Sequence, residues 1–374
     1  MLLARTAGTM LSLILVLLSL ERFRSPEVAG AVTFFTIVPG LLVSPIAGAL
    51  LDRHGRTRLV ILDYSVAALS LGAIAALAAL DILSVPLLIA IVTVASLTQP
   101  LSNTGIRTLF PLLVPEELWQ RANAIDSNGY VVAAIAGPAS AGALVAFVGS
   151  PGALAVTALV YAFAVVVTIG LRDPGPITER GRLLGDAWAG LVYVARHPTL
   201  RALAFAVSTS NVAWGLNFLA LPVLVLERFG RGADLVGELF ALIGVAGSLS
   251  VLIFGRIPSA GREARLMGGA MLAMAAAFVA LALAPDPLVV VAAMLAFGIA
   301  NGPFDVVLFT LRQRRTDPAW LGRAFAVSMA LNYAGIPLGS AAGGLVVARS
   351  VELAFALAAA LEGLSAFVAF RYVR

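Results

Sequence analysis

Long apolar runs separated by short polar stretches form most of this chain. A helix that crosses a bilayer needs about 20 predominantly apolar residues. Runs of this kind recur along the sequence, and each ends at charged residues, proline or glycine. Backbone in lipid must satisfy its own hydrogen bonds, so uninterrupted runs predict helices rather than barrel strands. The predicted spans are 3–20, 28–51, 59–80, 85–108, 122–147, 152–171, 201–226, 235–256, 264–284, 288–311, 322–347 and 352–371.

The composition is typical of a chain whose solvent is lipid. Of its 374 residues, 60% are hydrophobic and 12% are charged. Soluble domains carry about 25% charged residues, so this chain has too few to cover itself with polar surface. We therefore expect an all-α membrane protein with twelve transmembrane helices.

The basic residues indicate how the spans are oriented. All 25 are arginines, and the net charge of +5 could by itself suggest nucleic-acid binding. The arginines lie instead in stretches between spans, mostly on one predicted side, as the positive-inside rule describes. We expect both termini in the cytoplasm and no nucleic-acid partner. The arginines on the opposite side are Arg22, Arg24, Arg228, Arg231 and Arg349.

The longest polar connection divides the chain into two parts. Residues 172–200 open with prolines and a glycine, which break the preceding helix. Apolar residues, among them Trp188 and Leu191, then recur at helical spacing and predict a short amphipathic helix on the inner membrane surface. The predicted domains are an N-terminal six-helix bundle (1–171), a cytoplasmic linker (172–200) and a C-terminal six-helix bundle (201–374).

The two predicted bundles repeat each other. The sequence Leu-Glu-Arg-Phe at 20–23 recurs at 226–229. Further glycines match in the same order: Gly30, Gly40 and Gly48 correspond to Gly237, Gly247 and Gly255, and Gly137 and Gly142 to Gly339 and Gly344. An ordered series of this kind predicts a parallel duplication of one six-helix unit.

A polar stretch between the second and third spans carries a motif, and we expect it to form a tight loop at a membrane face. It matches the loop signature G-x-L-x-D-R-x-G-R-(K/R) at Gly48, Leu50, Asp52, Arg53, Gly55 and Arg56, whereas Thr57 departs from it. Together with the duplication, this motif makes nearly the whole chain resemble the major facilitator superfamily (MFS). The resemblance implies two pseudo-symmetric bundles. It also implies a cytoplasmic gating motif of Gly48, Asp52, Arg53, Gly55, Arg56 and Arg58.

Small residues in the fifth and eleventh spans extend the resemblance. Residues 133–142 are similar to the antiporter signature G-x-x-x-G-P-x-x-G-G, with alanine at two glycine positions. With Trp119-Gln-Arg-Ala before the fifth span, they resemble the drug, macrolide and siderophore exporter branch. Ordinary close helix packing is the alternative explanation. The candidate packing residues are Gly137, Pro138, Gly142, Gly339, Gly343 and Gly344.

Charged residues inside spans are candidates for proton coupling or substrate binding. Each costs about 2.5–3.5 kcal/mol at the centre of a span on insertion scales, so each requires a reason. Asp305 and Glu362 lie well inside their spans, and Arg107 resembles the helix-4 arginine of MFS antiporters. A structural ion pair or snorkelling to headgroups would be the alternative. Asp63 and Asp126 lie nearer the predicted cytoplasmic ends, and we expect them to reach water.

The resemblance also implies that the first, fourth, seventh and tenth spans line a central cavity. Neutral polar and aromatic residues in these spans suit amphipathic or hydrophobic solutes better than phosphates or sugars. Interhelical hydrogen bonds are the alternative role for many of them. The cavity candidates are Thr9, Gln99, Asn103, Asn211, Trp214, Asn217, Asn301 and Phe304.

Other classes of function are poorly supported. Without lysine there is no phosphate-binding loop, and without cysteine there is no thiol site. His54 and His197 lie in predicted cytoplasmic stretches, so we expect no enzyme, no metal and no cofactor. We expect a monomeric secondary transporter in the plasma or inner membrane, with a small-molecule substrate and protons as the coupling ion. A proton-coupled importer and a non-transporting receptor or assembly protein remain alternatives.

Overall fold

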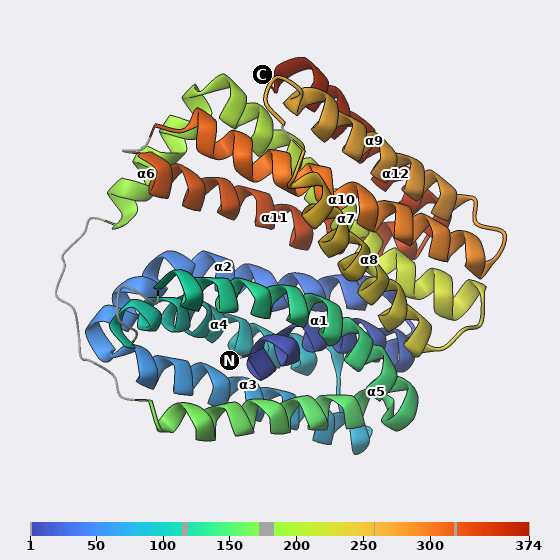
Figure 1. The fold of residues 1–374 in the computed structure, drawn as a ribbon. Coiled ribbons are helices and arrows are strands. Elements are labelled where there is room, and N and C mark those ends of the chain that lie inside the picture. The colour runs from blue at the N-terminus through green and yellow to red at the C-terminus, as the bar shows by residue number, and fades with distance from the viewer. Residues whose placement is uncertain (1, 114–118, 172–182, 258, 318–319, 374) are drawn as a thin grey trace. The chain divides into compact units, whose positions relative to one another are not determined.

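Helices account for nearly all of the described chain (Figure 1). The computed structural model describes residues 2–113, 119–171, 183–257, 259–317 and 320–373. Its elements are α1 (Leu2–Phe23), α2 (Pro26–His54), α3 (Arg56–Ala79), α4 (Val85–Leu113), α5 (Trp119–Ile169), α6 (Leu183–Arg196), α7 (Pro198–Val223), the π-helical turn η2 (Leu224–Arg228), α8 (Ala233–Phe254), α9 (Glu263–Ala282), α10 (Pro287–Arg315), α11 (Leu321–Val347) and α12 (Val351–Tyr372).

The predicted spans are confirmed, although two of them join into one element. Eleven helices of the described residues are long and apolar enough to cross a membrane. One of these, Gly129–Ile169, has 41 residues and would extend about 60 Å, twice the thickness of a bilayer core. It is interrupted at Gly149, whose φ of 72° is not helical. The two limbs of α5 therefore correspond to the predicted spans 122–147 and 152–171, which gives twelve crossings.

The chain forms two compact units of helices. Unit 1 comprises Met1–Arg24, Ala31–Gly181 and Ala233–Ala241, and in it α3 packs on α4 and α5 while α1 packs on α5. Unit 2 comprises Ser25–Gly30, Arg182–Gly232 and Leu242–Arg374. Its main contacts join α7 to α11 and α12, and α9 to α10 and α12.

Glycines allow the closest helix contacts, and these contacts repeat with the sequence. In unit 1, a Cβ on Gly142 would lie 2.9 Å from the Cα of Gly237. In unit 2, a Cβ on Gly344 would lie 3.2 Å from the Cα of Gly30. Gly142 corresponds to Gly344, and Gly237 corresponds to Gly30, in the duplication seen in the sequence. The duplicated sequence therefore builds the same glycine contact in each unit.

The predicted short helix after the first bundle is present as α6, which packs against α7 and α11 within unit 2. The Tyr193 ring stacks on Trp320 with centroids 5.0 Å apart and planes 8° apart. The Tyr193 hydroxyl also accepts a hydrogen bond from the backbone N–H of Asp317 at 3.1 Å. Trp188, on another face of α6, remains 67% exposed, as expected for an amphipathic helix.

The polar motif between α2 and α3 does not form the loop that we expected. Residues up to His54 continue α2, α3 begins at Arg56, and the one non-helical residue between them is Gly55 with φ 90°. The charged residues there are all compatible with a helix, so a single glycine is enough to reverse the chain direction. Arg53 and Arg58 are exposed, whereas Arg56 is only 5% exposed. The surroundings of Gly48 and Asp52 lie outside the described side chains.

Candidate functional site

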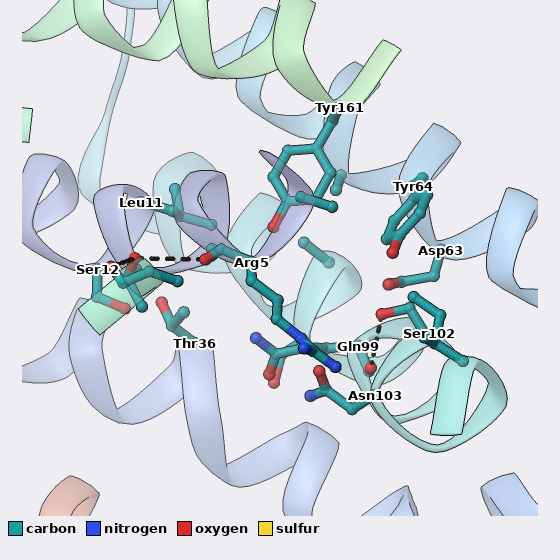
Figure 2. Close-up of a pocket in the computed structure, with 18 of the residues that line it drawn as sticks. Arg5, Leu11, Ser12, Thr36, Asp63, Tyr64, Gln99, Ser102, Asn103 and Tyr161 are labelled. Carbon is teal, nitrogen blue, oxygen red and sulfur yellow. Dashed lines mark hydrogen bonds between the residues drawn. The ribbon is translucent and has the colours of Figure 1, made fainter. Parts of the chain in front are cut away.

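A polar cavity of about 260 Å³ lies inside unit 1, between helices that are otherwise apolar (Figure 2). Helices α1 to α5 all contribute to its wall. The polar and aromatic side chains that line it are Arg5, Thr9, Ser12, Thr36, Asp63, Tyr64, Ser96, Gln99, Ser102, Asn103, Tyr130 and Tyr161. Polar groups inside membrane-spanning helices are costly, so their convergence marks the candidate site.

Asp63 of α3 supplies a carboxyl group to the cavity. Asp63 is only 4% exposed, so our expectation that its side chain simply reaches water was wrong. The Thr98 hydroxyl of α4 donates a hydrogen bond to Asp63 Oδ1 at 2.7 Å. The Ser102 hydroxyl, one turn further along α4, lies beside the same carboxyl (Figure 2). Residues 98 and 102 share one face of a helix, so α4 presents two hydroxyls to a single carboxyl.

Aromatic rings and one arginine complete the wall. The Tyr64 and Tyr161 rings lie 5.9 Å apart, and Tyr161 approaches α1 closely because Gly8 has no side chain. The Arg5 guanidinium lies 3.7 Å above the Tyr130 ring, at cation–π distance. Figure 2 shows the Arg5 side chain extending toward Gln99 and Asn103. The cavity therefore contains two charged residues, Arg5 and Asp63, in addition to the neutral polar and aromatic lining that we predicted.

The structure divides the predicted cavity residues between the two units. Thr9, Gln99 and Asn103 line the cavity of unit 1. The Thr9 hydroxyl also donates to the Ala133 carbonyl at 2.8 Å, which links α1 to α5. The remaining candidates belong to unit 2: Asn211, Trp214, Asn217, Asn301 and Phe304.

Several of the unit 2 candidates make interhelical contacts. The Asn211 amide donates to the Asn332 carbonyl at 2.9 Å and so links α7 to α11. The Trp214 ring stacks on Phe297 of α10 with centroids 5.4 Å apart. Asn217 is fully buried, and neither amide atom has a hydrogen-bond partner among the described residues. Asn301 is partly exposed, and Phe304 is buried.

The three predicted coupling residues have different environments. Asp305 of α10 is partly exposed in unit 2. Glu362 of α12 is fully buried and accepts a hydrogen bond from the Ser210 hydroxyl of α7 at 2.7 Å. Its other carboxyl oxygen has no partner in the described part of the chain. The side chain of Arg107 lies outside the described residues.

Sequence reasoning missed three charged residues that the fold buries or brings together. Arg5 and Asp63 share the unit 1 cavity, and Arg312, which directly follows the predicted span 288–311, is 1% exposed. With the Asn332 amide oriented to satisfy both groups, Arg312 Nη2 donates to the amide oxygen at 2.8 Å. One sequence feature could have identified these three residues. Each lies inside an apolar run or directly at its end, where a charged residue is costly.

The predicted helix-packing residues lie at close contacts. In unit 1, a Cβ on Gly137 would collide with the Thr9 hydroxyl, and one on Gly142 would lie 2.5 Å from the Ala233 carbonyl oxygen. In unit 2, a Cβ on Gly339 would collide with the Val212 carbonyl, whereas Gly343 has ordinary contacts at 3.4 Å. Pro138 lies inside α5 and Pro337 lies inside α11, but Ser340 occupies the position of α11 that corresponds to Pro138 in the repeat.

Comparison with known proteins finds membrane transport proteins by sequence. A family model described as "Transmembrane secretion effector" matches residues 17–373. An uncharacterized MFS-type transporter, y4rN, from Sinorhizobium fredii (strain NBRC 101917 / NGR234) is 40% identical over 367 residues, covering 97% of this chain and 91% of that protein. The multidrug efflux pump Tap of Mycolicibacterium fortuitum is 28% identical over 83% of this chain and 78% of its own length.

Solved structures share the fold at low sequence identity. The nucleoside transporter NupG matches with a TM-score of 0.76 and 15% identity, covering 99% of this chain and 98% of that chain. A bacterial homologue of the iron transporter ferroportin, solved in an inward-facing state, matches with a TM-score of 0.76 and 18% identity. This second match covers 100% of this chain and 96% of the other. At these identities the likeness concerns the fold alone.

Proposed function

Because the chain belongs to the major facilitator superfamily of transporters, in the family described as transmembrane secretion effectors, we propose that it exports amphipathic small molecules by proton-driven alternating access. The observation that carries this proposal is the polar and aromatic cavity enclosed by the apolar helices of unit 1. Its tyrosines offer flat apolar surface, while its amides and hydroxyls can orient a solute by hydrogen bonds.

Two observations favour export over import. The relative Tap is named as a multidrug efflux pump, and it aligns with 83% of this chain. In addition, α5 keeps Gly137 and Pro138 of the sequence pattern that resembles the antiporter signature. A proline inside a helix bends its axis, and the glycine lets α1 approach at the bend.

We assign coupling to charged residues inside spans, with Asp305 of α10 as the principal group and Glu362 of α12 and Arg107 of α4 as further candidates. A carboxyl in a span costs about 2.5–3.5 kcal/mol on insertion scales, which a role in proton transfer would explain. We assign gating to Asp52 and the arginines at the α2–α3 junction, because a charged cluster can make and break ion pairs between two states. The arginine bias supports cytoplasmic termini in a plasma or inner membrane, and we propose that the monomer is the working unit.

Transport into everted membrane vesicles tests the proposal. The expressed protein should accumulate ethidium, an amphipathic dye, when the vesicle interior is acidic, and nigericin should abolish this accumulation. Asp305→Asn should lose gradient-driven accumulation but keep dye exchange without a gradient, because binding remains while coupling is lost. The matched control is Asp286→Asn, which changes an exposed carboxyl at the beginning of the same helix, where asparagine also caps well.

The result also separates the alternatives. Accumulation only with an alkaline interior would favour an importer, and no movement under any gradient would favour a receptor or assembly protein. Full coupling in Asp305→Asn would remove the coupling assignment. In whole cells, an impermeant maleimide should label Ser84→Cys in the α3–α4 turn but not His54→Cys, if the termini are cytoplasmic.

A further inference from the structure

Arg5 directs its guanidinium group from α1 into the unit 1 cavity (Figure 2). The guanidinium carbon lies 3.7 Å from the centre of the Tyr130 ring. A Cβ on Gly129 would lie 3.2 Å from Arg5 Nη1, so the missing side chain at Gly129 leaves room for the guanidinium. Stacking on Tyr130 uses the face of the guanidinium, and its five N–H donors point outward in the same plane. Arg5 can therefore bind a solute in addition to its contacts within the protein.

Gln99 and Asn103 bring two side-chain amides to the same part of the cavity. They are four residues apart on α4 and therefore share one face of this helix. Figure 2 shows the Arg5 side chain extending toward both of them. Both residues are exposed, so a solute can reach them from water. A guanidinium with two amides beside it is an arrangement of N–H donors that suits a carboxylate group.

The Asp63 carboxyl, which is the other charged group in the lining of this cavity, faces a different side of α4. The Thr98 hydroxyl donates to Asp63 Oδ1 at 2.7 Å, and Ser102 lies beside the same carboxyl. Residues 99 and 103 are each rotated by about 100° around the helix from residues 98 and 102. Asp63 is 4% exposed, whereas the two amide residues are exposed. The cavity thus has a buried acidic side next to hydroxyls and an accessible side with N–H donors.

We propose that Arg5, Gln99 and Asn103 bind the carboxylate of an aromatic solute, so that small aromatic carboxylates are the favoured substrates of the unit 1 cavity. The Tyr64 and Tyr161 rings, 5.9 Å apart, line the same cavity and provide apolar surface for the aromatic part. The volume of about 260 Å³ suits a small solute. Ethidium has no carboxylate and should bind less tightly. This inference rests on the proposed function, because it takes this cavity as the solute site.

The test compares two ligands of almost equal shape, 1-naphthaleneacetate and the neutral 1-naphthaleneacetamide. Titration calorimetry measures their affinities for the purified full-length protein in detergent at neutral pH, without a gradient. The wild type should bind the carboxylate at least about tenfold more tightly than the amide, because hydrogen bonds to an ion are stronger than those to a neutral group. Arg5→Gln and Asn103→Asp should each remove this preference. Arg228→Gln, which changes an exposed arginine in unit 2, is the matched control and should keep it.

Equal affinity for the two ligands in the wild type would refute the carboxylate site, as would a preference that persists in Arg5→Gln. If Arg5→Gln does not fold, an unchanged preference in Asn103→Asp refutes the site, because residue 103 is exposed and can accept aspartate. Sulfate that binds as tightly as 1-naphthaleneacetate would show a general anion site and refute the assignment to aromatic carboxylates. Ethidium export without a carboxylate preference would refute this inference and leave the proposed transport function intact. A carboxylate preference without any export would do the reverse.

Discussion

The Glu362 carboxyl has a single hydrogen-bond partner in the described structure. Ser210 donates to one oxygen, and the other oxygen is buried without a partner. Two turns further along α7, both amide atoms of Asn217 are also buried without partners. A buried polar group left unsatisfied costs about 1–3 kcal/mol. Glu362 and Asn217 on these neighbouring helices therefore lower the stability of the fold. Residues that lower stability are expected where they serve a function, which is consistent with a functional role for Glu362.

Substitutions of Glu362 and of its hydrogen-bond donor Ser210 should change the free energy of unfolding in opposite directions. Glu362→Leu removes the unsatisfied oxygen at similar side-chain volume, so it should stabilise the fold by about 1–3 kcal/mol. Ser210→Ala removes the remaining donor and should destabilise it by a similar amount. Thermal midpoints in detergent measure both effects. A loss of stability in Glu362→Leu would show instead that the carboxyl is well satisfied in the native protein.

The site could be predicted from the sequence only in part, for a physical reason. Thr9, Gln99 and Asn103 follow from polarity in spans that the family resemblance assigns to a cavity. Asp63 and its partner Thr98 are 35 positions apart, on different helices. Hydropathy records that each lies in a span, but helix rotation and pairing decide whether a carboxyl reaches water or a neighbouring hydroxyl.

Helices were the most predictable feature, because the bilayer sets their length and requires internal hydrogen bonds. Boundaries moved by a few residues where polar sequence is also compatible with a helix. The largest difference is at the α2–α3 junction, where we expected a loop and the structure has only Gly55 outside helices. Conversely, Gly149 interrupts α5 where the sequence predicted two spans.

The contact between α7 and α11 in unit 2 depends on glycine. A Cβ on Gly339 would collide with the Val212 carbonyl, which is backbone and cannot turn aside. Gly339→Ala should therefore separate the helices and destabilise the protein by about 1–3 kcal/mol. The matched control is Gly363→Ala on α12, where nothing lies within 4 Å of the added Cβ. That change should be neutral or stabilise the helix by up to about 1 kcal/mol. Equal midpoints for the two variants would contradict this packing.

Over the whole molecule, duplication connects sequence to architecture. The repeated glycines predicted two six-helix bundles. In the structure, Gly142 contacts Gly237 in unit 1, and the corresponding Gly344 contacts Gly30 in unit 2. The repeat did not predict which polar side chains differ between the two units. In the repeat, Asp63 of α3 falls opposite Gly269 or Ala270 of α9, and neither of these residues has a carboxyl group. Side-chain divergence within an equivalent fold can give one unit a binding cavity that the repeat alone does not specify.

The most direct measurement is solute protection of a cysteine in the unit 1 cavity. The chain contains no cysteine, so a single Ser12→Cys substitution introduces one thiol on the cavity wall. The account predicts that ethidium slows alkylation of this thiol by N-ethylmaleimide several-fold, while leaving the exposed Ser84→Cys control unaffected. Export of ethidium with no protection at Ser12→Cys, or equal protection at both positions, would contradict the assignment of this cavity as the solute site.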